Sequence, residues 1–323
     1  MIKLLRRKAL RIITIGLAGL SLSACGEQMD SSVADNQETV RAGILQFMEH
    51  VSLTDAKNGF IEELTAADIT IEFEEMNAQG DQSNLQSMSE QLKNNNDLIL
   101  AIATPAAQSV ALAEEKKPVL FTAVTDPVDA GLVDSMETPG RNLTGTSDMV
   151  PIEEQITLLL SLIEQPKTIG IAYNSSEPNS KIQADLAVAE LESAGIDAIV
   201  ATVTTSNDVQ TTINSLAEDV DGLYLPTDNT MAATMPTIGE IAAAYKIPVV
   251  AGATGMVDDG ALATYGINYK DLGKQTARMA LRVLQDGQEP GMMAVETSDN
   301  LELVVNEEMA EALEIDPESI SLD

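Results

Sequence analysis

From Val40 onward, short apolar runs alternate with stretches whose apolar residues recur at helical spacing. An apolar run bounded by polar residues is typical of a buried strand, and helical spacing indicates an amphipathic helix. We therefore expect strands over 42–47, 69–73, 98–103 and 119–124, and helices over 53–64, 85–92 and 106–114. This alternation predicts an α/β fold in which a parallel sheet has helices on both faces.

The same series of elements then begins again, which indicates an internal duplication. Matching residues keep their order and element type, while their offset drifts from 127 to 124 and then 130, as changes in loop length would cause. The matches include Gly43 with Gly170, Ile69 with Ile196, Asp97 with Asp221, and Pro118 with Pro248. We expect two Rossmann-like lobes with parallel sheets; the alternative is one large doubly wound domain.

The C-terminal part of the chain adds fewer elements. A strongly amphipathic stretch predicts a helix over 271–284, followed by a strand over 301–305 and an acidic helix over 307–313. Because sequential elements usually lie adjacent, this tail should pack on the two lobes rather than form a third domain.

The N-terminus has the pattern of an export signal. Five basic residues and no acidic residue precede the apolar run 12–22. This run is too short to span a bilayer as a helix. The ending Leu22-Ser23-Ala24-Cys25 resembles the bacterial lipobox, whose cysteine becomes a lipidated N-terminus. We expect residues 1–24 to be a lipoprotein signal peptide, Cys25 to be lipidated at the outer face of the cell membrane, and polar residues 25–39 to form a flexible tether. An ordinary signal peptide with an incidental cysteine is the alternative.

Composition narrows the classes of partner. Without residues 1–24 the chain has 13 basic and 51 acidic residues, a net charge of −38, which would repel nucleic acid and anionic lipid. Such a charge is typical either of a protein whose acidic surface suits a salty or otherwise harsh extracellular environment, or of a protein that binds a cationic ligand. Because the acidic residues are spread along the chain, we favour the acidic-surface interpretation. Aromatic residues make up 3% and tryptophan is absent, so the core must be aliphatic. A lipidated Cys25 leaves no thiol for disulfides, so stability must come from burial.

The ends of the predicted strands provide a candidate ligand site, because ligands of open parallel sheets bind outside the carboxyl ends of the strands. Hydroxyls and free backbone N–H groups at a helix start suit a carboxylate, and Asp228 or Asp126 suits an ammonium, so an amino-acid zwitterion would fit. Alternatively, Thr104, Asn179 and Asp228 cap helices and Asp126 begins a turn. The candidate ligand-binding residues are Gln46, Phe47, Met48, Thr104, Ala106, Ala123, Thr125, Asp126, Tyr173, Asn174, Asp228 and Asn229.

Signals for catalysis are weak. His50 is the only histidine and is expected on the loop after the first strand. The chain contains none of the common phosphate-binding, zinc-binding or nucleophile motifs, and Asp258-Asp259 before Gly260 is typical of a solvated turn. We therefore expect no enzymatic activity, no cofactor and no metal.

Several segments resemble a known family when they are taken together. They cover 43–50, 77–81, 101–108, 121–127, 226–230 and 263–267. In these segments the chain resembles the type I substrate-binding lipoproteins of bacterial ABC importers, particularly their tryptophan-binding, TrpX-like group, over about residues 40–316. The resemblance implies three crossovers, near 146–151, 262–267 and 287–295. Lobe one would then comprise 40–146 plus 265–288, and lobe two 147–264 plus 289–323.

The resemblance also implies a function. The protein would be a monomer that captures an amino acid, tryptophan or another aromatic one, between its lobes and delivers it to an ABC permease with its ATPase. The alternative ligands are another amino acid, a sugar or a nucleoside. The alternative functions are a ligand-sensing lobe for a membrane kinase and an exported hydrolase. The resemblance implies that Thr104, Ala123 and Thr125 bind the carboxylate and ammonium of the ligand, and that Asp228 faces the ammonium. Three further residues could flank an aromatic side chain of the ligand: Phe47, Met48 or Tyr173.

Overall fold

The computed structural model describes residues 39–322. The predicted signal peptide, Cys25 and nearly all of the predicted tether lie outside these residues. In the described part of the chain, no helix combines the length and apolar character that a membrane-spanning helix needs.

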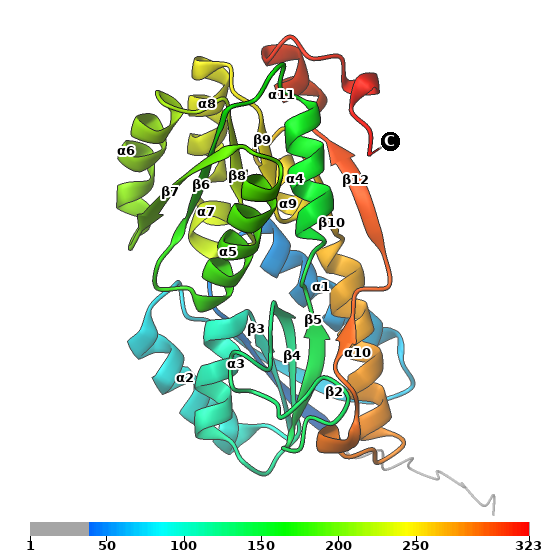
Figure 1. The fold of residues 1–323 in the computed structure, drawn as a ribbon. Helices are drawn as coiled ribbons and strands as arrows, with labels where there is room; N and C mark the ends of the chain where they lie inside the picture. The colour runs from blue at the N-terminus through cyan, green and yellow to red at the C-terminus, as the bar shows by residue number, and fades with distance from the viewer. Residues whose placement is uncertain (1–38, 323) are drawn as a thin grey trace, which may run out of the picture. The chain divides into compact units, whose positions relative to one another are not determined.

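The first lobe is built on a parallel sheet with the strand order β2-β1-β3-β4-β5-β11. Helices α2 and α3 pack together on one face, and α1 and α10 pack together on the other (Figure 1). The strands are β1 (Val40–Gln46), β2 (Ile71–Asn77), β3 (Leu98–Ile102), β4 (Val119–Val124), β5 (Leu143–Ser147) and β11 (Glu296–Thr297). The helices are α1 (Val51–Ala66), α2 (Gln82–Asn95), α3 (Thr104–Ala113), α10 (Tyr269–Leu284) and the short 3-10 helix η1 (Pro290–Met292).

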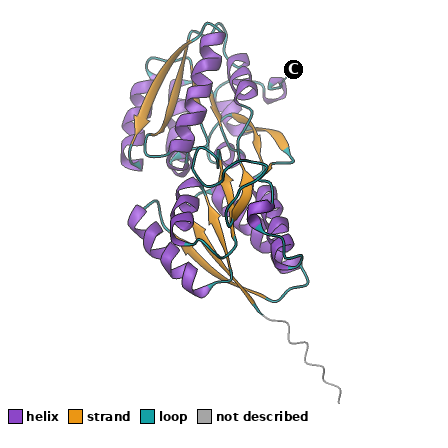
Figure 2. Ribbon diagram, turned by 60° about the horizontal axis from the view of Figure 1, so that its bottom comes forward, coloured by secondary structure: helices purple, strands orange, loops and turns teal. Residues whose placement is uncertain are grey.

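The second lobe repeats this plan with the strand order β7-β6-β8-β9-β10-β12, in which only β12 runs antiparallel to its neighbour. Figure 2 shows the strands of each lobe set among helices. The strands are β6 (Thr168–Asn174), β7 (Asp197–Val203), β8 (Gly222–Leu225), β9 (Val249–Ala251), β10 (Ala263–Ile267) and β12 (Leu301–Val305). The helices are α4 (Ile152–Ser161), α5 (Pro178–Ser193), α6 (Ser206–Ala217), α7 (Asn229–Ala233), α8 (Met235–Tyr245), α9 (Thr254–Asp258), α11 (Glu307–Ala312) and the 3-10 helix η2 (Pro317–Ser319).

The predicted duplication is confirmed by this shared strand order and by an equivalent hydrogen bond in each lobe. The Asp97 carboxylate accepts the backbone N–H of Arg41 at 2.9 Å, and the matching Asp221 accepts that of Thr168 at 2.9 Å. In both lobes this aspartate precedes the third strand and holds the start of the first. The alternative of one large doubly wound domain is therefore wrong.

The second strand was expected over 69–73, but β2 begins at Ile71 and continues to Asn77. Charged residues interrupt the apolar alternation, but β2 is an edge strand with a half-exposed face. There Glu75 forms an ion pair with Lys57 of α1 at 3.0 Å. An edge strand can carry such charges, which also hinder unwanted pairing.

The chain passes between the sheets three times: after β5, after β10 and after β11. Two boundaries differ from those expected. Residues 265–267 belong to β10 of the second sheet, and Glu296 still pairs with Thr146 in the first sheet, so the last passage follows Thr297 rather than residue 288. Helix α10 holds β11 in lobe one, because Gln275 donates to the Thr297 carbonyl at 3.0 Å and Arg282 forms an ion pair with Glu296.

Candidate functional site

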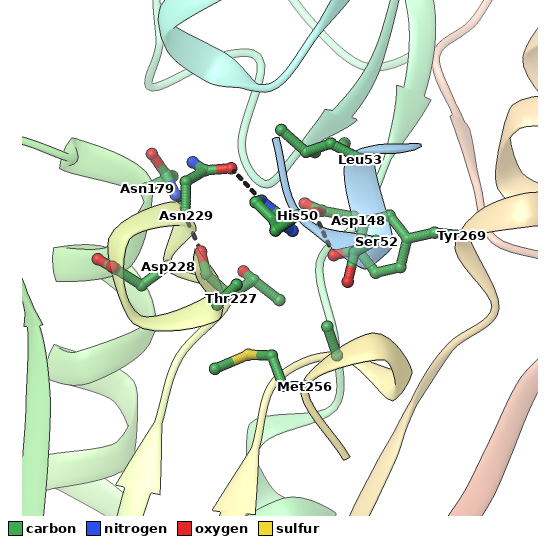
Figure 3. Close-up of a pocket in the computed structure, with 13 residues that line it drawn as sticks. His50, Ser52, Leu53, Asp148, Asn179, Thr227, Asp228, Asn229, Met256 and Tyr269 are labelled. Atoms are coloured by element: carbon green, nitrogen blue, oxygen red, sulfur yellow. Dashed lines mark hydrogen bonds between the residues drawn. The ribbon is translucent and has the colours of Figure 1, made fainter. Parts of the chain in front are cut away.

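A pocket lies between the lobes, at the carboxyl ends of their parallel strands (Figure 3). Lobe one and the segment after β5 contribute His50, Ser52, Leu53, Ala123, Asp148 and Tyr269. Lobe two contributes Asn179, Thr227, Asp228, Asn229, Ala232, Ala253 and Met256.

One link across the pocket runs from His50 to Glu177. His50 Nε2 lies 3.1 Å from Asn229 Oδ1 in the other lobe. Asn229 in turn donates its side-chain Nδ2 to Glu177 Oε2 at 2.5 Å and its backbone N–H to the same oxygen at 3.1 Å. Thr230 donates its backbone N–H and its hydroxyl to Glu177 Oε1 at 3.2 and 3.0 Å. The buried carboxylate therefore fixes the start of α7 and, through it, the amide that faces His50.

A second link joins the lobes through Thr125. Gln183 of α5 donates its Nε2 to Thr125 Oγ1 at 3.2 Å and also bonds the hydroxyl of Thr227 in its own lobe. Thr125 donates to Asp148 Oδ1 at 3.0 Å, and the Tyr269 hydroxyl donates to Asp148 Oδ2 at 2.6 Å. This polar chain connects α5 of lobe two with the start of α10 in lobe one.

Three buried acids surround the pocket, and among its lining residues there is no lysine or arginine. Burial raises the pKa of Asp148 and of Asp228. Burial, together with the nearby Asp228 charge, raises the pKa of Glu177 to about 8. Burial also lowers the pKa of His50 to about 4, so its imidazole is neutral at physiological pH. Buried acids without a protein cation suit a ligand that brings positive charge.

Unpartnered polar atoms gather at the same pocket. In residues 39–322, five buried side-chain polar atoms lack a hydrogen-bond partner. They are His50 Nδ1, Ser52 Oγ, Thr104 Oγ1, Asn179 Oδ1 and Arg282 Nε, and the residues of the first, second and fourth line the pocket. Buried polar groups are normally paired, and leaving one unpaired costs roughly 1–3 kcal/mol, so these atoms indicate a bound polar group.

Of the predicted ligand residues, Ala123, Asp228 and Asn229 line the pocket, and Thr125 contacts it through Asp148 and Thr227. Asp228 also caps α7: its Oδ1 accepts the Met231 N–H and its Oδ2 the Asn174 N–H, each at 2.8 Å. Asp228 is thus both a helix cap and a residue of the pocket. The capping interpretation is wrong for Thr104 and Asn179, because the caps of α3 and α5 are Ala103 and Glu177 and neither helix start has a side-chain cap bond.

The other predicted residues lie outside the lining of this pocket. Gln46 donates within lobe one to the Met48 carbonyl at 2.8 Å, and Asp126 accepts the N–H groups of Val128 and Asp129, which confirms the turn interpretation. Asn174 donates its side-chain amide to Thr230 at 2.8 Å. The rest are buried or partly buried in the lobes: Phe47, Met48, Thr104, Ala106 and Tyr173.

Of the thirteen residues that line the pocket, only Ala123, Asp228 and Asn229 are among the candidate ligand-binding residues. Five residues that sequence reasoning missed take part in the two hydrogen-bonded links described above. Asp148 lies in a segment expected only as a crossover, Tyr269 begins α10, and Glu177 and Gln183 belong to the start and interior of α5. His50 lies after the first strand, as expected, but it also lines the pocket, so its position at that strand end is a usable signal. The rule that ligands bind at strand ends could have indicated His50. No local sequence pattern distinguishes the other four residues.

The fold and the pocket between its lobes define a ligand-binding protein of the type I periplasmic-binding class. The chain matches the family model described as "ABC transporter substrate binding protein" over residues 41–322, and it belongs to that family. Proteins of this family bind substrates outside the cytoplasm and do not transform them. A tyrosine-binding protein of Clostridioides difficile is 38% identical over 323 residues, covering 96% of this chain and 93% of the relative.

Two solved structures allow the lobe arrangement to be compared. An ABC domain in complex with L-Trp from Streptococcus pneumoniae is 38% identical with a TM-score of 0.83, covering 87% of this chain and 97% of that one. A ligand-free, open substrate-binding protein with adhesive properties from Clostridium difficile is 41% identical with a TM-score of 0.66, covering 86% and 95%. The lower score at higher identity, together with the hydrogen bonds across the pocket, indicates that the lobes of this chain are closed.

Proposed function

We propose that this protein captures an aromatic amino acid, tyrosine or tryptophan, in the pocket between its lobes and delivers it to an ABC permease with its ATPase. The observation that carries the proposal is the set of unpartnered acceptors and buried acids around one pocket without a protein cation. The α-ammonium of an amino acid supplies several hydrogen-bond donors and one positive charge, and this set of acceptors and acids supplies neither. The ligands named for the two relatives, tyrosine and L-Trp, agree with it.

The ammonium is assigned to the part of the pocket that holds Asp148, Asp228 and Asn179. Asp148 accepts two side-chain hydrogen bonds, one on each oxygen, and keeps capacity for more. Asp228 accepts the backbone N–H groups of Asn174 and Met231 and is also hydrogen-bonded by Ser180 and Thr230, so its capacity is nearly filled. Asp148 is therefore the better ion-pair partner, and Asp228 contributes charge from the other lobe.

The carboxylate is assigned to the adjacent ends of β3 and β4. Ala103 and Ala123 lie there with φ of 80° and 56°, and both are buried. Such backbone costs alanine about 1–2 kcal/mol and is characteristic of ligand sites. The buried hydroxyl of Thr104, which opens α3, is unpartnered and can donate to the carboxylate.

Calorimetric titration of residues 26–323 with the twenty amino acids, common sugars and nucleosides tests the proposal. We expect saturable binding of tyrosine or tryptophan, and a thermal shift equivalent to about 2.7 kcal/mol at a hundredfold excess over Kd. Binding of a sugar or nucleoside alone would contradict the amino-acid assignment.

We also propose that lipid on Cys25 tethers the mature protein, as a monomer, to the outer face of the membrane. The support is the leader-like residue order of 1–24 and the lipobox-like Leu22 to Cys25. Expression of the full chain and of Cys25→Ser tests the tether. The full chain should fractionate with membranes and the variant should not; equal membrane fractions would exclude Cys25 as the anchor.

A further inference from the structure

We propose that His50 is a specificity-determining residue: its neutral imidazole accepts a hydrogen bond from the donor on the ligand's aromatic ring, a phenol O–H or an indole N–H. This inference rests on the proposed function and specifies the side-chain class that the same pocket selects. It predicts that phenylalanine, whose ring has no donor, binds more weakly than tyrosine.

The hydrogen bonds of lobe two fix the tautomer of His50. Asn229 directs its Nδ2 to Glu177 Oε2 at 2.5 Å, so its Oδ1 must be the atom that faces the imidazole. An amide oxygen only accepts, so the His50 Nε2 that lies 3.1 Å away must carry the hydrogen. If Glu177 carries a proton on Oε1, directed towards Thr230, its Oε2 still accepts a hydrogen bond from Asn229. The side-chain amide of Asn229 then keeps the same orientation.

This tautomer leaves Nδ1 as a pure acceptor. Nδ1 is buried and has no protein partner, and the ring lines the pocket. In the family fold a ligand group is the natural partner for such an atom, because leaving a buried acceptor unpaired is unfavourable. A carboxylate is excluded as that partner, since it has no hydrogen to donate.

The sheet order of lobe one separates His50 from Asp148, the proposed ion-pair partner of the ammonium. In the first sheet, β1 leads to His50 and β5 leads to Asp148, and β3 and β4 lie between them. With the carboxylate at the ends of β3 and β4, the ammonium lies toward β5 and the side chain toward β1. Leu53 of α1, with Ala232 and Met256 of lobe two, supplies apolar surface for a ring in the same pocket.

Titration of tyrosine and phenylalanine into the wild type and His50→Phe tests this role. The wild type should prefer tyrosine by about tenfold or more, the equivalent of ~1.4 kcal/mol for one hydrogen bond. His50→Phe removes the acceptor and keeps a flat ring, so the preference should largely disappear through weaker tyrosine binding. His50→Gln, which retains an acceptor oxygen, should restore part of it.

Equal weakening of both amino acids by His50→Phe would overturn the proposal, as would a wild type that does not distinguish them. If the wild type binds no aromatic amino acid, the proposed function itself fails. Because His50 is the only histidine, ¹⁵N-histidine NMR of the untagged wild type gives a second readout that needs no variant. Tyrosine should shift the resonance of the unprotonated ring nitrogen and phenylalanine should not; an identical response to both would contradict the inference.

Discussion

The Asp228 carboxylate accepts backbone N–H groups from Asn174 and Met231 while it also lines the ligand pocket. Asp228→Ala should therefore lower both stability and affinity. We expect a loss of about 1–3 kcal/mol in the free energy of unfolding, because buried donors lose their acceptor. Ligand affinity should fall between several-fold and a hundredfold, measured by calorimetry alongside urea unfolding.

Asp126→Ala is the matched control for this substitution. Asp126 also follows a strand end and also accepts two backbone N–H groups, those of Val128 and Asp129 at 3.0 and 2.9 Å, but it lies outside the pocket lining. Its removal should change affinity by less than about twofold, since it stabilises only an exposed turn. Unchanged affinity in Asp228→Ala as well would remove Asp228 from the ligand site.

The titration of the buried acids predicts a ligand-free protein that loses stability between pH 6.5 and 8. Glu177 has a folded pKa of about 8 against an ordinary value of 4.5, so over this range the folded state still holds a proton that the unfolded state has already lost. The free energy of unfolding should fall by up to ~1.4 kcal/mol per pH unit for one such group. His50 acts in the opposite sense, but only between its folded pKa of about 4 and its ordinary 6.5.

Urea unfolding of the wild type and Glu177→Gln across this pH range checks the assignment. Glutamine preserves an acceptor for Asn229 and cannot titrate, so the slope between pH 6.5 and 8 should become shallower. Burial also raises the pKa values of Asp148 and Asp228, so the difference in slope between the two proteins, rather than the slope of either one, measures the contribution of Glu177. A variant with the wild-type slope would show that Glu177 stays ionised in the folded state.

At the scale of elements, α10 returns from β10 of lobe two to pack against α1 of lobe one, and two glycines permit their close approach. A Cβ at Gly273 would fall on the Ala56 carbonyl, and one at Gly59 on the Lys270 carbonyl. Gly273→Ala should therefore force the helices apart and lower the free energy of unfolding by about 1–3 kcal/mol or more, as overpacking does. Thermal and urea unfolding measure this loss.

Gly131→Ala separates crowding from the general cost of replacing glycine. Gly131 has a φ of 70°, and a Cβ there would meet nothing within 4 Å. Its substitution should cost only the backbone term, about 1 kcal/mol. If Gly273→Ala costs no more than Gly131→Ala, the glycine contact does not set the spacing of α1 and α10.

Hydrophobic patterning predicted the helices and strands well, because each buried strand and each helix that covers a sheet face has its own local pattern of apolar residues. The strands 119–124 and 301–305 have the predicted limits, and the duplicated aspartates Asp97 and Asp221 have equivalent bonds. Boundaries failed where pairing partners were distant in sequence. Glu296 joins the first sheet through Thr146, a contact that no local pattern encodes.

The candidate site was predictable only where it follows strand ends. That rule found Ala123, Asp228 and Asn229, but it also included Asp126, which forms a turn. It missed Gln183, because the approach of Gln183 to Thr125 depends on how the second lobe meets the first. It missed Asp148, because Tyr269, which bonds it, is 121 residues away in the sequence.

For the whole molecule, closure depends on differential interactions, since contacts that exist only in the closed form shift the population toward it. The Gln183–Thr125 hydrogen bond at 3.2 Å joins the lobes. Ser89 and Ser109 form a comparable side-chain bond at 2.8 Å wholly within lobe one. The two bonds allow the effect of a bond between lobes to be compared with that of a bond inside one lobe.

Thr125→Val should favour the open form, because it removes the acceptor of the Gln183 bond between the lobes while keeping the side-chain shape. It also removes the Thr125 donor to Asp148 within lobe one, so the radius of gyration, rather than affinity alone, reports the effect on closure. Loss of about 1 kcal/mol from the closed state shifts the closed-to-open ratio roughly fivefold and weakens ligand binding by a similar factor. Small-angle scattering should show a smaller radius of gyration on ligand addition to the wild type, with more ligand needed for the same change in the variant. Ser89→Ala should behave like the wild type in both measurements. A Thr125→Val protein that closes at the wild-type ligand concentration would mean that the ligand's own contacts, rather than the link through Thr125, determine closure.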